Sequence, residues 1–217
     1  MNAIIENPWK GLSEEAPFIA KIDEPFFNNN RKVLSHLELK VYPDAFLGNF
    51  EKAEVVFLLL NPGFQKRDLT TYMKDPIYVA KNKESLLEQT EDFYVLNFEY
   101  SGGYLWWRRI LKAIIVRGIS IDELKQKIFC VQLFPYHSIK YKHINRELPS
   151  QAYSLQLVRK AIAQNKKIVL MRSEQLWLKA IPELTGKYIK VRNPRNPAIS
   201  KKNMNPKDFE EIYRLLS

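Results

Sequence analysis

Four amide side chains end or follow apolar runs in this 217-residue chain. An amide carries both a hydrogen-bond donor and an acceptor, so it can orient a water molecule or pair with the edge of a nucleobase. Any one of them alone fits a turn residue or a satisfied core amide, and the combination is what favours a binding site. The four are Asn61 after Val55–Leu60, Gln132 within Ile128–Phe134, and Asn193 and Asn196 after Tyr188–Val191.

The run Val55–Leu60 and the turn residues that follow it predict a buried strand with a sharp end. Six consecutive apolar residues lead into Asn61-Pro62-Gly63, which is the pattern of a parallel strand covered on both faces. Pro62 has no backbone N–H, and Gly63 accepts a positive φ. In open α/β sheets, ligands bind outside the carboxyl ends of the strands. We therefore expect Asn61 at the binding edge of the sheet.

The alternation of strands and helices predicts the fold class. We expect an α/β protein built as a three-layer α/β/α sandwich around a mainly parallel, four-stranded central sheet. Residues 1–217 are expected to form one domain, with residues 1–50 as an irregular and helical N-terminal extension packed on it. The expected strands are Val55–Leu60, Ile128–Phe134, Lys167–Met171 and Tyr188–Val191. The expected helices are Tyr104–Val116, a short helix capped by Ser120, Ser150–Gln164, Glu174–Ile181 capped by Ser173, and a last helix capped by Asn205. The segment Phe93–Tyr100 is expected to be extended.

The charge of the chain favours a polyanionic partner, most simply nucleic acid. There are 34 Lys and Arg residues against 24 Asp and Glu residues, a formal charge of +10. A basic protein without such a partner is the alternative. The single cysteine, Cys130, lies in an apolar run and is expected to be a buried thiol. No membrane-length apolar stretch and no secretory signal are recognised, so we expect no membrane partner and a cytoplasmic location, or a nuclear one in a eukaryote.

Several common catalytic motifs are absent from the sequence. It has no Walker phosphate loop, no GxGxxG after a strand, no HExxH, and no GxSxG. These absences count against nucleotide hydrolysis, dinucleotide binding, zinc hydrolysis and the common serine hydrolases. We therefore expect neither a cofactor nor a metal.

The order of four motifs resembles the uracil-DNA glycosylase superfamily. The motifs are LLLNPGF, FCVQLFPYH, IVLMRSEQLWL and VRNPRNPAIS, and together they cover about Glu54 to Lys202. The first is similar to the Asn-Pro-Gly motif of the mismatch-specific and single-strand-selective branches. The last is similar to the Pro-Arg-Asn-Pro loop of the single-strand-selective branch.

The resemblance implies a monofunctional, metal-free DNA-repair glycosylase that flips a damaged base and releases it by water attack. Asn61 would position the water for attack at the sugar C1′. The backbone of Pro62 and Gly63 would contact the flipped base, and Gln132 would pair with its edge. Phe64 is the candidate stacking aromatic, although a packing role fits it equally well, and Tyr72 is the fallback.

The same resemblance assigns the last motif to DNA. Asn193, Arg195 and Asn196 would contact DNA, with Arg195 and Asn196 entering it at the flipped nucleotide. Lys201 and Lys202 would contact phosphates, or else form an ordinary solvated face. A monomer is the default expectation.

Two positions depart from the superfamily pattern. Gln132 stands where the family has an Asn on the second strand, and Val191 stands where the single-strand-selective branch has a His that stabilises the leaving base. Either catalysis is weak, or His137 approaches from another strand, or the activity is lost. His137 ends Phe134-Pro135-Tyr136-His137, which is similar to the Asp-Pro-Tyr-His of the classical enzymes but follows a different strand and lacks the Asp; a structural or DNA-facing His is the simpler interpretation.

These departures leave two alternatives to the glycosylase. One is a catalytically weak or inactive member of the superfamily that binds nucleic acid or a nucleobase. The other is an unrelated α/β enzyme acting on a small phosphorylated ligand, which the missing phosphate loops disfavour.

Overall fold

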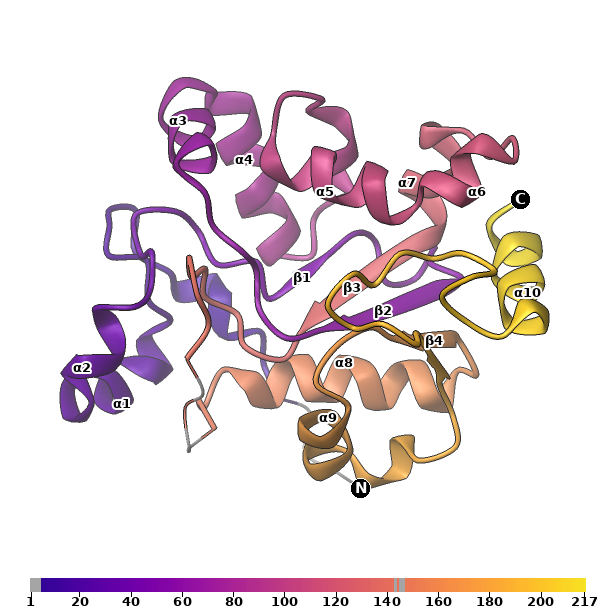
Figure 1. The fold of residues 1–217 in the computed structure, drawn as a ribbon. Helices are drawn as coiled ribbons and strands as arrows, with labels where there is room; N and C mark the ends of the chain where they lie inside the picture. Colours follow the sequence, from indigo (N-terminus) through magenta and orange to yellow (C-terminus); the bar gives the residue numbers. More distant parts are fainter. Residues whose placement is uncertain (1–4, 143, 145–146) are drawn as a thin grey trace.

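The computed structural model describes residues 5–142, 144 and 147–217, and it has an α/β fold around a five-stranded mixed sheet (Figure 1). Residues 1–4, which belong to the N-terminal stretch in which no secretory signal is expected, lie outside the described residues. The strand order is β1-β3-β2-β4-β5. β2, β3, β4 and β5 pair in parallel, whereas β1 pairs antiparallel with β3. The strands are β1 Phe46–Leu47, β2 Val55–Leu59, β3 Ile128–Gln132, β4 Lys167–Leu170 and β5 Ile189–Lys190.

The predicted α/β class is confirmed, and the predicted number of strands is wrong. All four expected strands are present, each shorter than its apolar run. The strand that the sequence did not reveal is β1, whose two residues are too few to show a periodic pattern. It adds an antiparallel edge beside β3, so the sheet is mixed.

Helices bury both faces of the sheet, which explains the unbroken apolar run of β2. Val55, Phe57 and Leu59 face one core, and Val56 and Leu58 face the other. Helices α8 (Gln151–Ala163) and α9 (Glu174–Ala180) lie on the side of Val56 and Leu58. The other core is closed by α5 (Gly102–Ile110), α7 (Ile121–Lys127) and α10 (Pro206–Leu216).

The remaining helices include α4 (Pro76–Leu86), which contacts β1. The N-terminal segment packs against the body through Trp9, whose ring meets Tyr136 edge-on at 5.9 Å. None of the described helices is both long and apolar enough to cross a membrane. The other helices are α1 Glu24–Asn29, α2 Arg31–Leu34, α3 Lys66–Lys74, α4 Pro76–Leu86 and α6 Lys112–Val116, with 3₁₀ turns at Pro8–Gly11, Lys21–Asp23, Tyr94–Asn97 and Pro182–Leu184.

Tertiary contacts overrode three local predictions. The helix expected over Tyr104–Val116 is broken at Leu111, because the Ile110 carbonyl accepts the Ile199 N–H at 2.9 Å. The segment expected to be extended, Phe93–Tyr100, contains a 3₁₀ turn whose apolar side chains are buried against α5. Ser173 does not cap α9, since its φ of 59° is left-handed and its side chain accepts no cap hydrogen bond.

Two caps and the cysteine followed the prediction. Ser120 forms a capping box with Glu123 at the start of α7, and the Asn205 side chain accepts the Lys207 N–H at 3.0 Å at the start of α10. Cys130 is buried in β3, and burial raises the pKa of its thiol. Local sequence patterns therefore located the ends that local hydrogen bonds determine.

Candidate functional site

The segments that follow β2 and β3 continue side by side beyond the sheet. The Leu60 carbonyl accepts the Phe134 N–H at 2.8 Å, and the Pro62 carbonyl accepts the Ser138 N–H at 3.2 Å. Gly63 and Ser138 form an isolated parallel bridge. The Asn-Pro-Gly turn is thus held against the segment that carries His137.

The Asn61 amide is anchored by its nitrogen. Its Nδ2 donates to the Pro62 carbonyl at 2.9 Å and to Ser138 Oγ at 2.8 Å. A carbonyl only accepts hydrogen bonds, so this contact identifies which amide atom is the nitrogen. No donor among the described residues reaches Oδ1. The half-buried Asn61 therefore presents a fixed, unused acceptor.

Gln132 ends β3 beside Leu59 of β2 and is 5% exposed. Its Oε1 is buried and has no hydrogen-bond partner within the described part of the chain. Leaving a buried acceptor unpaired costs about 1–3 kcal/mol. A hydrogen-bonding ligand would remove this cost, so Gln132 is a strong binding candidate.

The two candidate aromatics have different surroundings. Phe64 is buried and meets the His137 ring edge-on, with 6.2 Å between the ring centroids. Tyr72 instead packs against Phe18 and Tyr42, at 6.1 and 5.7 Å. Burial raises the pKa of Tyr72. Phe64 is therefore the aromatic that adjoins the Asn61 turn, and its stacking role stays a prediction.

His137 lies between two acceptors. Its Nδ1 is 2.9 Å from the Gly63 carbonyl, and its Nε2 is 3.3 Å from Asp44 Oδ2. Burial lowers the pKa of His137, but the hydrogen bond and charge of Asp44 outweigh it, with help from the Gly63 carbonyl and Asp68, and the net shift is upward. The arrangement favours the imidazolium form.

Asp44 is the functional candidate that the sequence did not reveal. It is 8% exposed, and its Oδ1 accepts from Asn82 Nδ2 at 2.8 Å and from the Tyr94 hydroxyl at 3.4 Å. Its backbone N–H donates to the Pro135 carbonyl at 3.0 Å. No local motif marks Asp44, because its partners come from α4, from a 3₁₀ turn and from the segment after β3.

A second carboxylate, Asp68, lies close to this group. It is the third residue of α3 and accepts the Gln65 N–H at 2.6 Å in a capping box. Burial raises the pKa of Asp68, against the lowering effect of the Gln65 hydrogen bond and of His137. A Cβ on Gly102, at the start of α5, would overlap Asp68 Oδ1. Gly102 thus permits the close approach of α5 to this carboxylate.

The loop after β5 is stapled by two asparagines. Asn193 Oδ1 accepts the Arg195 and Asn196 N–H groups at 3.0 and 3.3 Å. Asn203 Oδ1 accepts the Asn193 N–H at 2.8 Å, and its Nδ2 donates to the Asn196 and Ala198 carbonyls. Asn193 to Asn196 are exposed. The loop therefore presents Arg195 and Asn196 to solvent on a fixed backbone, as a DNA contact would require.

Lys201 and Lys202 are the remaining predicted DNA contacts, and Val191 is the position that departs from the family pattern. Lys201 forms an ion pair with Glu210 at 2.6 Å, whereas Lys202 is exposed. Val191 is 1% exposed and belongs to the apolar core. Its side chain therefore offers no polar group to a leaving base.

Arg172 follows β4, which lies between β2 and β5. Its Nε is buried without an acceptor among the described residues. Burial lowers the pKa of Arg172, and the nearby Arg109 charge lowers it further. Unpaired polar groups thus follow β2, β3 and β4 at the same edge of the sheet, and the Asn193–Pro197 loop follows β5.

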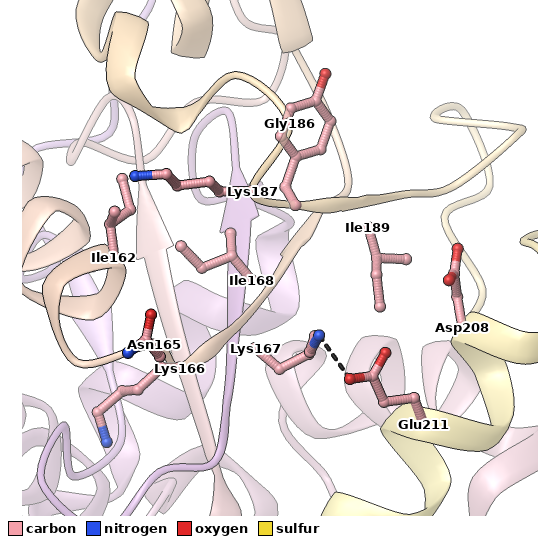
Figure 2. Close-up of a pocket in the computed structure, with 11 residues that line it drawn as sticks. Ile162, Asn165, Lys166, Lys167, Ile168, Gly186, Lys187, Ile189, Asp208 and Glu211 are labelled. Atoms are coloured by element: carbon pink, nitrogen blue, oxygen red, sulfur yellow. Dashed lines mark ion pairs between the residues drawn. The ribbon is translucent and has the colours of Figure 1, made fainter.

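Two cavities have none of the predicted site residues in their linings. One of about 370 Å³ is at the amino ends of β4 and β5, between Lys167, Ile168, Ile189 and Glu211 (Figure 2). The other, of about 350 Å³, lies between α5, α6 and Ala198–Ser200. Among the described residues, no three His, Cys, Asp or Glu side chains are grouped to hold a metal ion.

Comparisons with known proteins give no relative for this chain: no family model matches it, and neither a curated protein nor a solved structure matches it. The arguments for function therefore come from the residues and their geometry.

Proposed function

We propose that this protein is a DNA-repair glycosylase that hydrolyses the N-glycosidic bond of uracil or a related damaged base in a flipped nucleotide. The motif resemblance suggests the class. The observation that carries the proposal is the unpaired, buried Oε1 of Gln132 at the sheet edge that also carries the unused Asn61 Oδ1. An amide pairs with a base edge, and a second acceptor is what an attacking water needs.

In the proposed reaction, Asn61 acts by orientation. Its Oδ1 would accept a hydrogen bond from the water, whose oxygen bonds to C1′ as the C1′–N bond breaks. The electron pair leaves with the base, and the proton that the water loses passes to the base or to solvent. An amide is a weak base, so positioning is the contribution it can make. The hydrogen bonds to Ser138 and Pro62 support that role by fixing the amide.

The charge distribution near the site supports a DNA partner. Arg172, Arg109 and Arg195 form no ion pair with a carboxylate among the described residues, whereas Lys201 is paired with Glu210. Cations without partners are available to phosphates. We extend the proposal to a monomer with a three-layer α/β/α arrangement, working in the cytoplasm or, in a eukaryote, the nucleus.

A second candidate function is nucleic-acid or nucleobase binding without catalysis. The buried Val191 favours it, because this apolar side chain stands where the resembling branch has a leaving-group His. In that case the chain would bind single-stranded DNA with a strong salt dependence and release no base.

A base-release assay tests the proposal. Labelled single-stranded and duplex oligonucleotides carrying one uracil, hypoxanthine or xanthine are incubated with the protein, and abasic sites are then cleaved with alkali. We expect release from at least one substrate and its loss in Asn61→Ala. Asn29→Ala, an exposed amide on α1, is the matched control and should retain activity.

The outcomes separate the candidates. No release from any substrate, with salt-sensitive binding that Arg195→Ala weakens, would replace the glycosylase by the binding function. Neither release nor binding would overturn both.

A further inference from the structure

We propose that Asp44 and His137 are positioning residues of the candidate site: a charged His137, held by Asp44, fixes the Asn61 turn by binding the Gly63 carbonyl. This inference rests on the proposed function only for the role of Asn61. The geometry on which it stands is the chain of contacts from Asp44 through His137 to Gly63.

The two neighbours of the imidazole decide its protonation state. The Gly63 carbonyl at Nδ1 accepts only, so Nδ1 must carry a hydrogen. The Asp44 carboxylate at Nε2 is held by donors from Asn82 and Tyr94. A neutral His137 with its hydrogen on Nδ1 would turn a lone pair toward that carboxylate. The imidazolium satisfies both neighbours, and the upward shift of the His137 pKa agrees with it.

The ion pair acts on Asn61 from two sides. His137 binds the carbonyl of Gly63, two residues after Asn61. Ser138 follows His137 in the chain. Its Oγ accepts a hydrogen bond from Asn61 Nδ2 at 2.8 Å, and its backbone N–H donates to the Pro62 carbonyl. A displaced imidazole would release the Gly63 carbonyl and shift the Ser138 hydroxyl, so both anchors of the turn depend on His137.

The local charge balance argues for positioning rather than for stabilising a leaving base. Two carboxylates, Asp44 and Asp68, face His137, so the group of three carries a net negative charge when all are ionised. Both imidazole nitrogens are already occupied. An anionic leaving base would gain nothing from this cluster.

The remaining groups that face this pair do not change the sign of the pH effect. Burial raises the pKa values of the other titratable groups that face Asp44, so these groups stay neutral; they are Tyr72, Tyr78, Tyr94 and the Cys130 thiol. Arg67 faces Asp68, and Glu38 pairs with the His137 backbone rather than with its ring. A histidine whose pKa is raised by folding contributes stability below its unfolded pKa and loses it as the pH rises through the folded value. The turn should therefore loosen on the alkaline side.

Two NMR measurements on the whole protein test the inference without reference to activity. Imidazole ¹⁵N and ¹³C shifts report the His137 charge, and we expect its titration midpoint above that of the histidines in the urea-unfolded chain. The Asn61 side-chain amide signals should be sharp below that midpoint and broaden above it. In Asp44→Asn, the His137 midpoint should fall and the Asn61 signals should broaden at lower pH.

Asp122→Asn is the matched control, because it removes an exposed carboxylate from α7 and should leave both readouts unchanged. A neutral His137 below the unfolded midpoint would overturn the inference. The inference would also be overturned if the Asn61 amide signals did not change with the protonation of His137 in a folded Asp44→Asn variant. His137→Gln, which keeps a donor for Gly63 without charge, supplies a second variant if Asp44→Asn does not fold.

The test separates this inference from the proposed function. A coupled titration without base release would leave the positioning role intact and remove the glycosylase. Base release with an Asn61 amide that is independent of His137 would do the reverse.

Discussion

The two ends of the parallel strands differ in how their polar groups are satisfied. At the amino ends of β4 and β5 there is a cavity of about 370 Å³, and two of its lysines already have partners. Lys167 binds Glu211 at 2.6 Å (Figure 2), and Lys166 Nζ donates to the Ala53 carbonyl at 2.6 Å. At the carboxyl ends, Gln132 Oε1 and Arg172 Nε are buried without described partners.

The cavity and the unpaired buried groups thus lie at opposite ends of the strands. A lining group that already has a partner, such as Lys167, gains little from a polar ligand, because each new hydrogen bond would replace an existing one. Unpaired buried groups gain the full hydrogen bond on binding. The carboxyl edge is therefore the stronger candidate, in agreement with the general rule for open α/β sheets.

The largest effect is expected from Asn61→Ala. It removes the fixed acceptor at the carboxyl edge, and loss of one such hydrogen-bonding group typically costs about 100-fold or more in rate. The initial rate of base release under single-turnover conditions measures it. Glu211→Gln at the amino edge should leave that rate unchanged, and an equal loss in both variants would contradict the contrast.

A smaller effect is expected from Gly102→Ala. Its methyl group would displace Asp68 from the start of α5 and from its cap on Gln65, which should cost about 1–3 kcal/mol of unfolding free energy. Urea denaturation measures the change. Gly103→Ala is the control, because its Cβ would meet Val95 at an ordinary 3.4 Å; similar destabilisation in both would show that helix entry, rather than Asp68, is responsible.

Gln132→Leu should stabilise the fold while weakening function. It removes an unpaired buried amide, so we expect about 1 kcal/mol of added stability. Base release or base binding should fall, since the edge-reading group is gone. Thermal unfolding and the release assay measure the two effects, with the exposed Gln175→Leu on α9 as control. A Gln132→Leu variant that loses stability would mean that the amide has a structural partner.

The smallest effect is expected at the amino-edge cavity. Lys167 and Glu211 are 31% and 37% exposed, and ion pairs of this kind contribute less than about 1 kcal/mol. Lys167→Met should therefore shift the urea midpoint only slightly and leave DNA affinity unchanged. A large loss of DNA binding in this variant would move the interface to the opposite end of the sheet.

Local patterns in the sequence encode several elements of the fold. The apolar run Val55–Leu60 specified a strand buried on both faces, and Asn61-Pro62-Gly63 specified where it ends. Ser120 and Asn205 capped their helices, because a cap needs only neighbouring backbone N–H groups. The amides at the strand ends were likewise visible, since parallel topology carries strand ends to one edge.

Which groups meet at that edge depends on contacts between segments that are far apart in the chain. Asp44 reaches His137 because the segment before β1 lies beside the segment after β3, and no local spacing records this pairing. The same holds for the break at Leu111, made by a hydrogen bond from Ile199, and for the unpaired state of Gln132. Local periodicity reports which face of an element is buried, whereas the partner of a buried polar group depends on residues far along the chain.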